Sequence, residues 1–190
     1  QDIEDRFQIS ELSFPVKSPM CWKTASSLCR ETIADRSLPF MSLLMSLMWI
    51  AMCSKPELLF ACKYMARYGQ NFDIAHYRAL TRIARFACDA KHQGLVIRGW
   101  SFKQGLITLE LYTDSDFAAD LPTRKSTSGF VLYLNNDVLS FNSKLQTTVA
   151  SSTASAEVNA LALGATELMH YYRVISQIAE VQLPMIVHID

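Results

Sequence analysis

The hydrophobic periodicity of this 190-residue chain changes near Gly94. Before that point apolar residues recur at helical spacing, and after it apolar and polar residues alternate as they do in strands. A second helical pattern covers residues 149–181, and a last strand-like run covers 184–190. This order of helices, strands, one helix and one strand predicts an α/β fold with a mixed sheet.

Three segments follow from this pattern. Residues 1–37 have no sustained period and contain Pro15 and Pro19, which predicts an extended connector. Residues 38–92 are expected to form a helical region. Residues 94–190 are expected to form an α/β domain.

Several helix ends can be predicted in the first part of the chain. Ser37 and Ser54 are expected to cap helices, and a third cap is expected near Asp73. Residues 40–53 are apolar nearly all round, which predicts a helix buried on most of its sides. The last of these helices has an expected buried stripe of Tyr77, Leu80, Ile83, Ala84 and Ala87.

Two hairpins are expected in the second part of the chain. Residues 94–100 would pair with 106–114, and residues 129–134 with 138–144. The helix that follows has an expected buried stripe of Val158, Leu161, Ala165, Leu168 and Tyr172.

Charge is unevenly distributed although the whole chain has a net charge of zero. Residues 55–103 carry nine basic and three acidic residues, whereas residues 104–190 carry four and nine. Arg78, Arg82 and Arg85 share one helical face, so they could follow a phosphate backbone. A solvated helix face is the alternative interpretation.

Cysteine content and hydropathy indicate an intracellular setting. The five cysteines have scattered spacings without a C-x-x-C pair, as expected for a reduced protein. The most apolar run, residues 38–53, is shorter than the roughly 20 residues that a membrane-spanning helix needs. We therefore expect no membrane association.

Acidic residues gather where elements are expected to end. Asp114 and Asp116 close the strand LITLELYTD, and Glu157 lies early in the following helix. If the last strand runs parallel beside the first, Asp190 converges on Asp114 and Glu157. Three carboxylates suit a pair of hard divalent cations, which can promote phosphodiester cleavage. Aspartates are also common in turns, which leaves a purely structural alternative.

Several motifs resemble the Pol polyprotein of copia-type retrotransposons, at the passage from the reverse transcriptase thumb into the ribonuclease H domain. These are YTDSDFAAD, TRKSTSGFVLYL, SKLQTTVASSTASAEVNALAL and the final HID, with helices upstream similar to the thumb. The resemblance covers roughly residues 18–190. It implies a helical thumb-like region over 38–92 and a ribonuclease H-like domain over 94–190.

The resemblance also implies a function. Asp114, Glu157 and Asp190 would be the catalytic residues and would bind two Mg²⁺ or Mn²⁺ ions that cleave the RNA of an RNA/DNA hybrid, with Asp116 as electrostatic support. The rest of the reverse transcriptase polyprotein would be a partner, in the cytoplasm or a virus-like particle. Expected nucleic-acid contacts are Arg124, Lys125, Ser126 and Gln146, together with Arg78, Arg82 and Arg85.

Departures from the family pattern leave an alternative open. Met45 stands where the family commonly has glycine, and Ser155 where it has an acidic residue. The helix and strand expected beyond the third acid are missing, so we expect the domain to be C-terminally incomplete. A Y-x-D-D turn is absent, so these residues hold no polymerase site. The alternative is a catalytically inactive remnant, or a co-opted domain that binds nucleic acid or protein.

Overall fold

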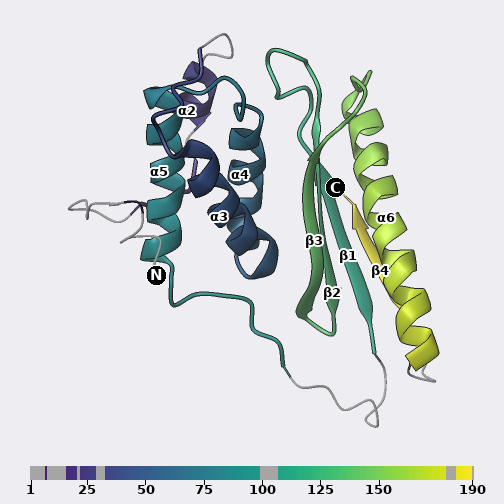
Figure 1. Ribbon diagram of the computed structural model, residues 1–190. Helices are drawn as coiled ribbons and strands as arrows, with labels where there is room; N and C mark the ends of the chain where they lie inside the picture. Colours follow the sequence, from purple (N-terminus) through teal and green to yellow (C-terminus); the bar gives the residue numbers. More distant parts are fainter. Residues whose placement is uncertain are drawn as a thin grey trace. The chain divides into compact units, whose positions relative to one another are not determined.

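The computed structural model describes residues 7, 16–20, 22–28, 33–98, 107–178 and 183–189 (Figure 1). It divides into two compact units, residues 1–94 and 95–190, which are described separately. The first unit is helical and the second is α/β, so the predicted fold class is confirmed. None of the described helices combines the length and apolar character needed to cross a bilayer.

The first unit contains four α-helices and one 3₁₀ helix within its described residues. They are α2 (Trp22–Ser27), α3 (Phe40–Cys53), η1 (Pro56–Leu58), α4 (Leu59–Ala66) and α5 (Ile74–Asp89). Leu80, Ile83 and Ala84 of the predicted α5 stripe are fully buried. The buried face of α5 therefore follows the sequence pattern.

Only one of the predicted caps in this unit is formed. The Asp73 carboxylate accepts hydrogen bonds from the backbone N–H groups of Ala75 and His76 at the start of α5. The Ser37 and Ser54 predictions were wrong. The Ser37 hydroxyl donates to Asp35, and Ser54 follows α3 and donates to a carbonyl oxygen of that helix.

Helix α3 is buried on one side only, which corrects the expectation of burial on most sides. Its buried residues are Phe40, Leu43, Leu44, Leu47 and Ala51. Its exposed apolar residues are Met41, Met45, Trp49 and Met52. The described residues of this unit supply a packing partner for a single stripe of the helix.

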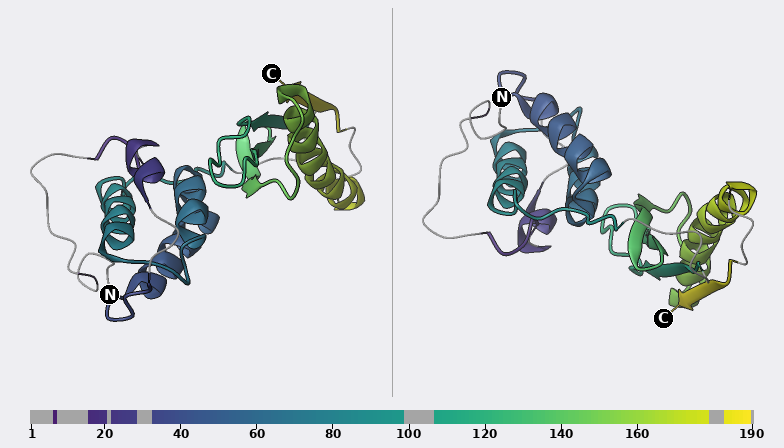
Figure 2. Two further views of the ribbon diagram at one scale, coloured as in Figure 1. Left: turned by 90° about the horizontal axis from the view of Figure 1, so that it is seen from above. Right: turned by 90° about the horizontal axis from the view of Figure 1, so that it is seen from below.

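The second unit is a four-stranded sheet with a long helix on one face (Figures 1 and 2). Its elements are β1 (Leu109–Ser115), β2 (Thr127–Leu134), β3 (Asp137–Leu145), α6 (Thr153–Ile178) and β4 (Met185–Ile189). The strand order is β3-β2-β1-β4, in which β1 and β4 are parallel and the other pairs antiparallel. The β2–β3 hairpin and the parallel last strand are therefore confirmed.

The first predicted hairpin does not form over the described residues. Residues 95–98 are not in a strand, and residues 99–106 lie outside the described part of the chain. The backbone N–H and the guanidinium of Arg98 instead donate to the buried carboxylate of Asp137, at 2.6 and 2.9 Å. This contact fastens the segment to the start of β3.

The buried stripe of α6 differs from the predicted one. Val158 is 63% exposed, whereas the buried residues are Ala156, Ala160, Gly164 and Leu168. Small residues allow the helix to approach the sheet closely, so the larger side chains lie on its flanks. Beneath α6, the core cluster comprises Leu109, Leu111, Phe130, Leu132 and Leu168.

Candidate functional site

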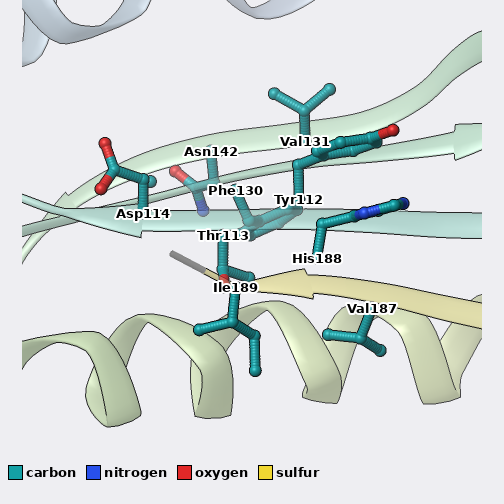
Figure 3. Close-up of a pocket in the computed structure, with 10 residues that line it drawn as sticks. Tyr112, Thr113, Asp114, Phe130, Val131, Asn142, Val187, His188 and Ile189 are labelled. Carbon is teal, nitrogen blue, oxygen red and sulfur yellow. The ribbon is translucent and has the colours of Figure 1, made fainter. Parts of the chain in front are cut away.

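The two faces of β1 have different surroundings. Leu109, Leu111 and Thr113 are buried on the face that α6 covers, whereas Tyr112 and Asp114 are exposed on the other. Figure 3 shows Asp114 and Tyr112 on the open side of the sheet and Thr113 on the α6 side. Strand alternation thus separates an apolar face from the acidic one, as the sequence pattern predicts.

Glu157 reaches the end of β1 from the α6 side. Helix α6 begins at a serine cap, because the Ser152 hydroxyl accepts from the backbone N–H of Ser155 at 3.1 Å. One turn later, Glu157 Oε1 accepts a hydrogen bond of 2.9 Å from Ser115 Oγ. Ser115 directly follows Asp114, so the structure brings the Glu157 carboxylate to the residue adjoining Asp114.

The second oxygen of this carboxylate is unsatisfied. Glu157 Oε2 is buried and has no hydrogen-bond partner among the described residues, and the same holds for Thr113 Oγ1 on the same face of β1. An unpaired buried carboxylate oxygen is costly. A cation or a water molecule at this position would remove that cost, so the donor set fits a divalent metal ion.

The third predicted acid cannot be placed. Strand β4 runs parallel to β1 and pairs Ile189 with Thr113, one residue before Asp114. Asp190 itself lies outside the described residues. Within the described ranges, no three His, Cys, Asp or Glu residues are grouped to hold a metal ion. The three-carboxylate site thus remains a prediction.

An open groove lies on the exposed face of the sheet beside Asp114. The ring of Tyr112 stacks on that of His188, with centroids 4.2 Å apart. The Tyr112 hydroxyl donates to Glu110 Oε2 at 3.3 Å, and His188 Nε2 lies 3.7 Å from the same oxygen. Desolvation, followed by the charge of Glu110, raises the pKa of Tyr112, which therefore stays a donor at neutral pH.

Sequence reasoning missed both Ser115 and the stacked pair. The signal for Ser115 was present, because two-residue alternation places it with Leu111 and Thr113 on the α6 face. The stacked pair required the register of β4, which sets Tyr112 opposite His188. Strand register cannot be derived from the alternation of either strand alone.

The loop after β1 is held by internal hydrogen bonds. Asp116 Oδ1 accepts from the backbone N–H of Thr127, and the N–H of Asp116 donates back to the Thr127 carbonyl at 3.2 Å. Ser126 is fully buried, and its hydroxyl accepts from the N–H of Ala118 at 3.0 Å. Asp116 and Ser126 therefore shape this loop.

The basic residues of the same loop are more accessible. Arg124 is exposed and Lys125 is half-buried. Arg124 has a φ of 53°, a conformation that non-glycine residues rarely adopt, and its N–H donates to the Asp120 carbonyl at 2.6 Å. The loop thus presents a guanidinium group on a fixed backbone.

Gln146 joins β2 to α6. Its Nε2 donates to Ser128 Oγ at 2.9 Å and to the Ala156 carbonyl at 3.0 Å. Its Oε1 accepts from Asn159 Nδ2 at 3.2 Å, and the residue is 8% exposed. The amide group is fully engaged inside this unit, which favours a structural role over a nucleic-acid contact.

The arginines of α5 do not share one exposed surface. Arg78 is exposed, Arg82 is half-buried and Arg85 is only 8% exposed. Arg82 Nη2 donates to the Ser18 carbonyl at 3.3 Å. Arg78 is therefore the accessible member of the predicted stripe.

Comparisons with known proteins place the chain among transposon-related sequences. It is 27% identical over 192 residues to the retrovirus-related Pol polyprotein from transposon TNT 1-94 of Nicotiana tabacum, which covers 98% of this chain. It spans 14% of that polyprotein.

Two shorter proteins are also similar. The secreted RxLR effector protein 161 of Plasmopara viticola is 30% identical over 126 residues, which are 66% of this chain and 86% of that protein. The uncharacterized mitochondrial protein AtMg00810 of Arabidopsis thaliana is 29% identical over 154 residues, or 81% of this chain and 62% of that protein.

No family model and no solved structure matches the chain. The similarities extend over most of its length and join the long polyproteins to the short proteins. The chain therefore belongs to the same family as the Plasmopara protein and is a distant homologue of copia-type retrotransposon Pol polyproteins.

Proposed function

We propose that this chain is the ribonuclease H part of a retrotransposon Pol polyprotein with the adjoining reverse transcriptase thumb, and that it cleaves RNA in RNA/DNA hybrids. The observation that carries the proposal is the buried, unpartnered Oε2 of Glu157. It lies in a carboxylate bound to Ser115, next to Asp114, at the end of β1. Asp190, which follows β4, is the third member of the proposed set.

The proposed chemistry depends on two Mg²⁺ or Mn²⁺ ions. When bound, such ions activate water and stabilise the leaving oxygen of a phosphodiester. The protein's part is to fix carboxylates on rigid elements, with Asp114 on a strand and Glu157 on a helix. Carboxylate oxygens are the ligands that these ions prefer.

The substrate would be held by the loop that follows β1. Arg124 is exposed on a fixed backbone, and Lys125 adjoins it, so both can contact phosphates of the hybrid. Ser126 and Gln146 are buried, and their contribution would be to hold this loop and its neighbouring strands in place. Further contacts from the remainder of the polyprotein are part of the proposal.

Asp114→Asn tests the proposal. The purified chain is incubated with a hybrid carrying fluorescent RNA, in Mn²⁺ and in Mg²⁺, and cleavage is followed by gel electrophoresis. We expect Asp114→Asn to reduce cleavage by at least about 100-fold, because loss of a metal ligand removes several kcal/mol of transition-state stabilisation. Glu110→Gln is the matched control on the same strand face and should leave cleavage within about 3-fold. Unchanged cleavage by Asp114→Asn would refute the assignment.

The second candidate is a catalytically inactive protein that binds nucleic acid or another protein. It is favoured by the similarity to short proteins, one of which this chain covers to 86%. This candidate predicts that the chain binds the hybrid in a salt-sensitive manner but does not cleave it. Metal-dependent turnover by the wild type would exclude it.

A further inference from the structure

We propose that Ser115 is a positioning residue that fixes the orientation of the Glu157 carboxylate for metal binding. This inference rests on the proposed function, because it concerns the same site. It assigns a role to a residue that neither the motif nor the acidic pattern singles out.

The geometry supports a specific contact across two elements. Ser115 and Glu157 are 42 positions apart in the chain, and their side chains come together because α6 packs along β1. Buried Ala156 is fixed against the sheet one residue before Glu157. The backbone at Glu157 is therefore anchored, whereas its long side chain still needs a contact to select one rotamer.

The hydrogen bond divides the tasks of the two carboxylate oxygens. Oε1 accepts from the Ser115 hydroxyl at 2.9 Å, which sets the plane of the carboxylate. Oε2 is buried and remains without a partner among the described residues. An ionised carboxylate is an acceptor only, so the partner that Oε2 lacks must be a donor or a cation.

A serine at this point has an effect that an apolar residue would not. Its hydroxyl donates to the ligand from behind, and such outer contacts commonly contribute 10- to 100-fold to metal affinity. A purely structural hydrogen bond would instead affect the stability of the fold and leave the metal affinity unchanged. These two roles can be separated by experiment.

The test compares three variants of the full chain. The Mn²⁺ affinity is measured by calorimetry and by paramagnetic resonance, and the melting temperature is measured without metal. We expect Ser115→Ala to weaken Mn²⁺ binding about 10-fold and Ser115→Thr, which keeps the hydroxyl, to bind nearly as the wild type does. Ser128→Ala is the matched control, because Ser128 pairs with Ser115 across the sheet and binds Gln146. It should lower the melting temperature without changing the affinity.

The possible failures are distinguishable. If the wild type binds Mn²⁺ and Ser115→Ala binds it equally well, the positioning role is overturned and the proposed function stands. If the wild type binds no Mn²⁺, both are overturned. If Ser115→Ala does not fold, Ser115→Cys replaces it. Cysteine is a weaker donor of similar size, so it should give an intermediate affinity, and wild-type affinity would again overturn the role.

Discussion

Gly164 lies where α6 crosses β1 with no space for a side chain. A Cβ at this position would lie 2.8 Å from Thr113 Cγ2 and 3.0 Å from Leu111 Cδ1. Both neighbours are buried, so neither can move aside freely. We expect Gly164→Ala to destabilise the second unit by about 1 kcal/mol, because overpacking of about 1–3 kcal/mol exceeds the gain in helix propensity of about 1 kcal/mol. Urea denaturation measures this change.

A double-mutant cycle isolates the steric cause. Thr113→Ser removes the methyl group that lies closest to the added Cβ, so the cost of Gly164→Ala should be smaller in the Thr113→Ser background. Gly94→Ala is the control for the glycine change itself, because a Cβ there meets nothing within 4 Å. An equal cost in both backgrounds would show that the contact with Thr113 is not the cause.

Gln146 provides a second test at the level of single residues. Gln146→Ala should destabilise the second unit by about 1–3 kcal/mol, because it removes three hydrogen bonds and leaves buried partners unpaired. Denaturant unfolding measures the loss, and exposed Thr147→Ala is the control. Weaker hybrid binding with unchanged stability would instead support the direct nucleic-acid contact that the family resemblance implies.

At the scale of elements, α5 depends on its first turn. Asp73 and His76 form a reciprocal capping box, so Asp73→Ala should destabilise the helical unit by about 1 kcal/mol. Burial opposes the ionisation of Asp73, but hydrogen bonds and charge from His76, with a hydrogen bond from Ala75, outweigh it and lower the Asp73 pKa. A lowered pKa means that ionised Asp73 stabilises the folded state.

The pH dependence of this cap has a definite sign. The stabilisation is present above the unfolded-state pKa of Asp73 and is lost as the pH falls through the lower folded-state pKa. Asp73→Asn keeps an oxygen acceptor without the charge, so it should retain most of the stability and lose this dependence. Thermal unfolding between about pH 2 and 6, where carboxyl groups titrate, tests the difference. Identical pH profiles for wild type and Asp73→Asn would contradict the assignment.

The elements of the second unit show how far the sequence pattern carries. Strands β1, β2 and β3 could be predicted because their apolar and polar residues alternate over a half-buried sheet, and β4 because it is a short apolar run. The buried side of α6 could not, because Ala156, Ala160 and Gly164 carry little hydrophobic signal and are buried for their small size. Large apolar residues such as Val158 suggested the wrong face. Helix α3 likewise looked buried all round because composition does not show which neighbours are present.

The candidate site could be predicted only in part. The strand and helix patterns place Asp114 and Glu157 at ends of neighbouring elements, and the structure joins them through Ser115. The role of Ser126 and Gln146 could not be read from the motif, since their burial depends on how the loop and α6 pack. The distinction between a phosphate contact and an internal hydrogen bond requires the tertiary structure.

At the scale of the whole molecule, each unit has its own hydrophobic core. Leu80 is fully buried among the helices of residues 1–94, and Leu132 is fully buried between the sheet and α6 in residues 95–190. Leu→Ala changes at such positions cost about 2–5 kcal/mol. Because the proposed site belongs to the second unit, a core defect in the first should leave it intact.

Hydrogen exchange of backbone amides tests this independence. Leu80→Ala should reduce protection in α3, α4 and α5 and leave β1, β2 and α6 as in the wild type, whereas Leu132→Ala should do the reverse. Mutations in separate cores without shared partners should also be additive in the double variant, within about 0.5 kcal/mol. If Leu80→Ala lowered protection in β1 or weakened Mn²⁺ binding, the two units would fold as one cooperative body. The site would then depend on the helices as well as on the sheet that carries Asp114.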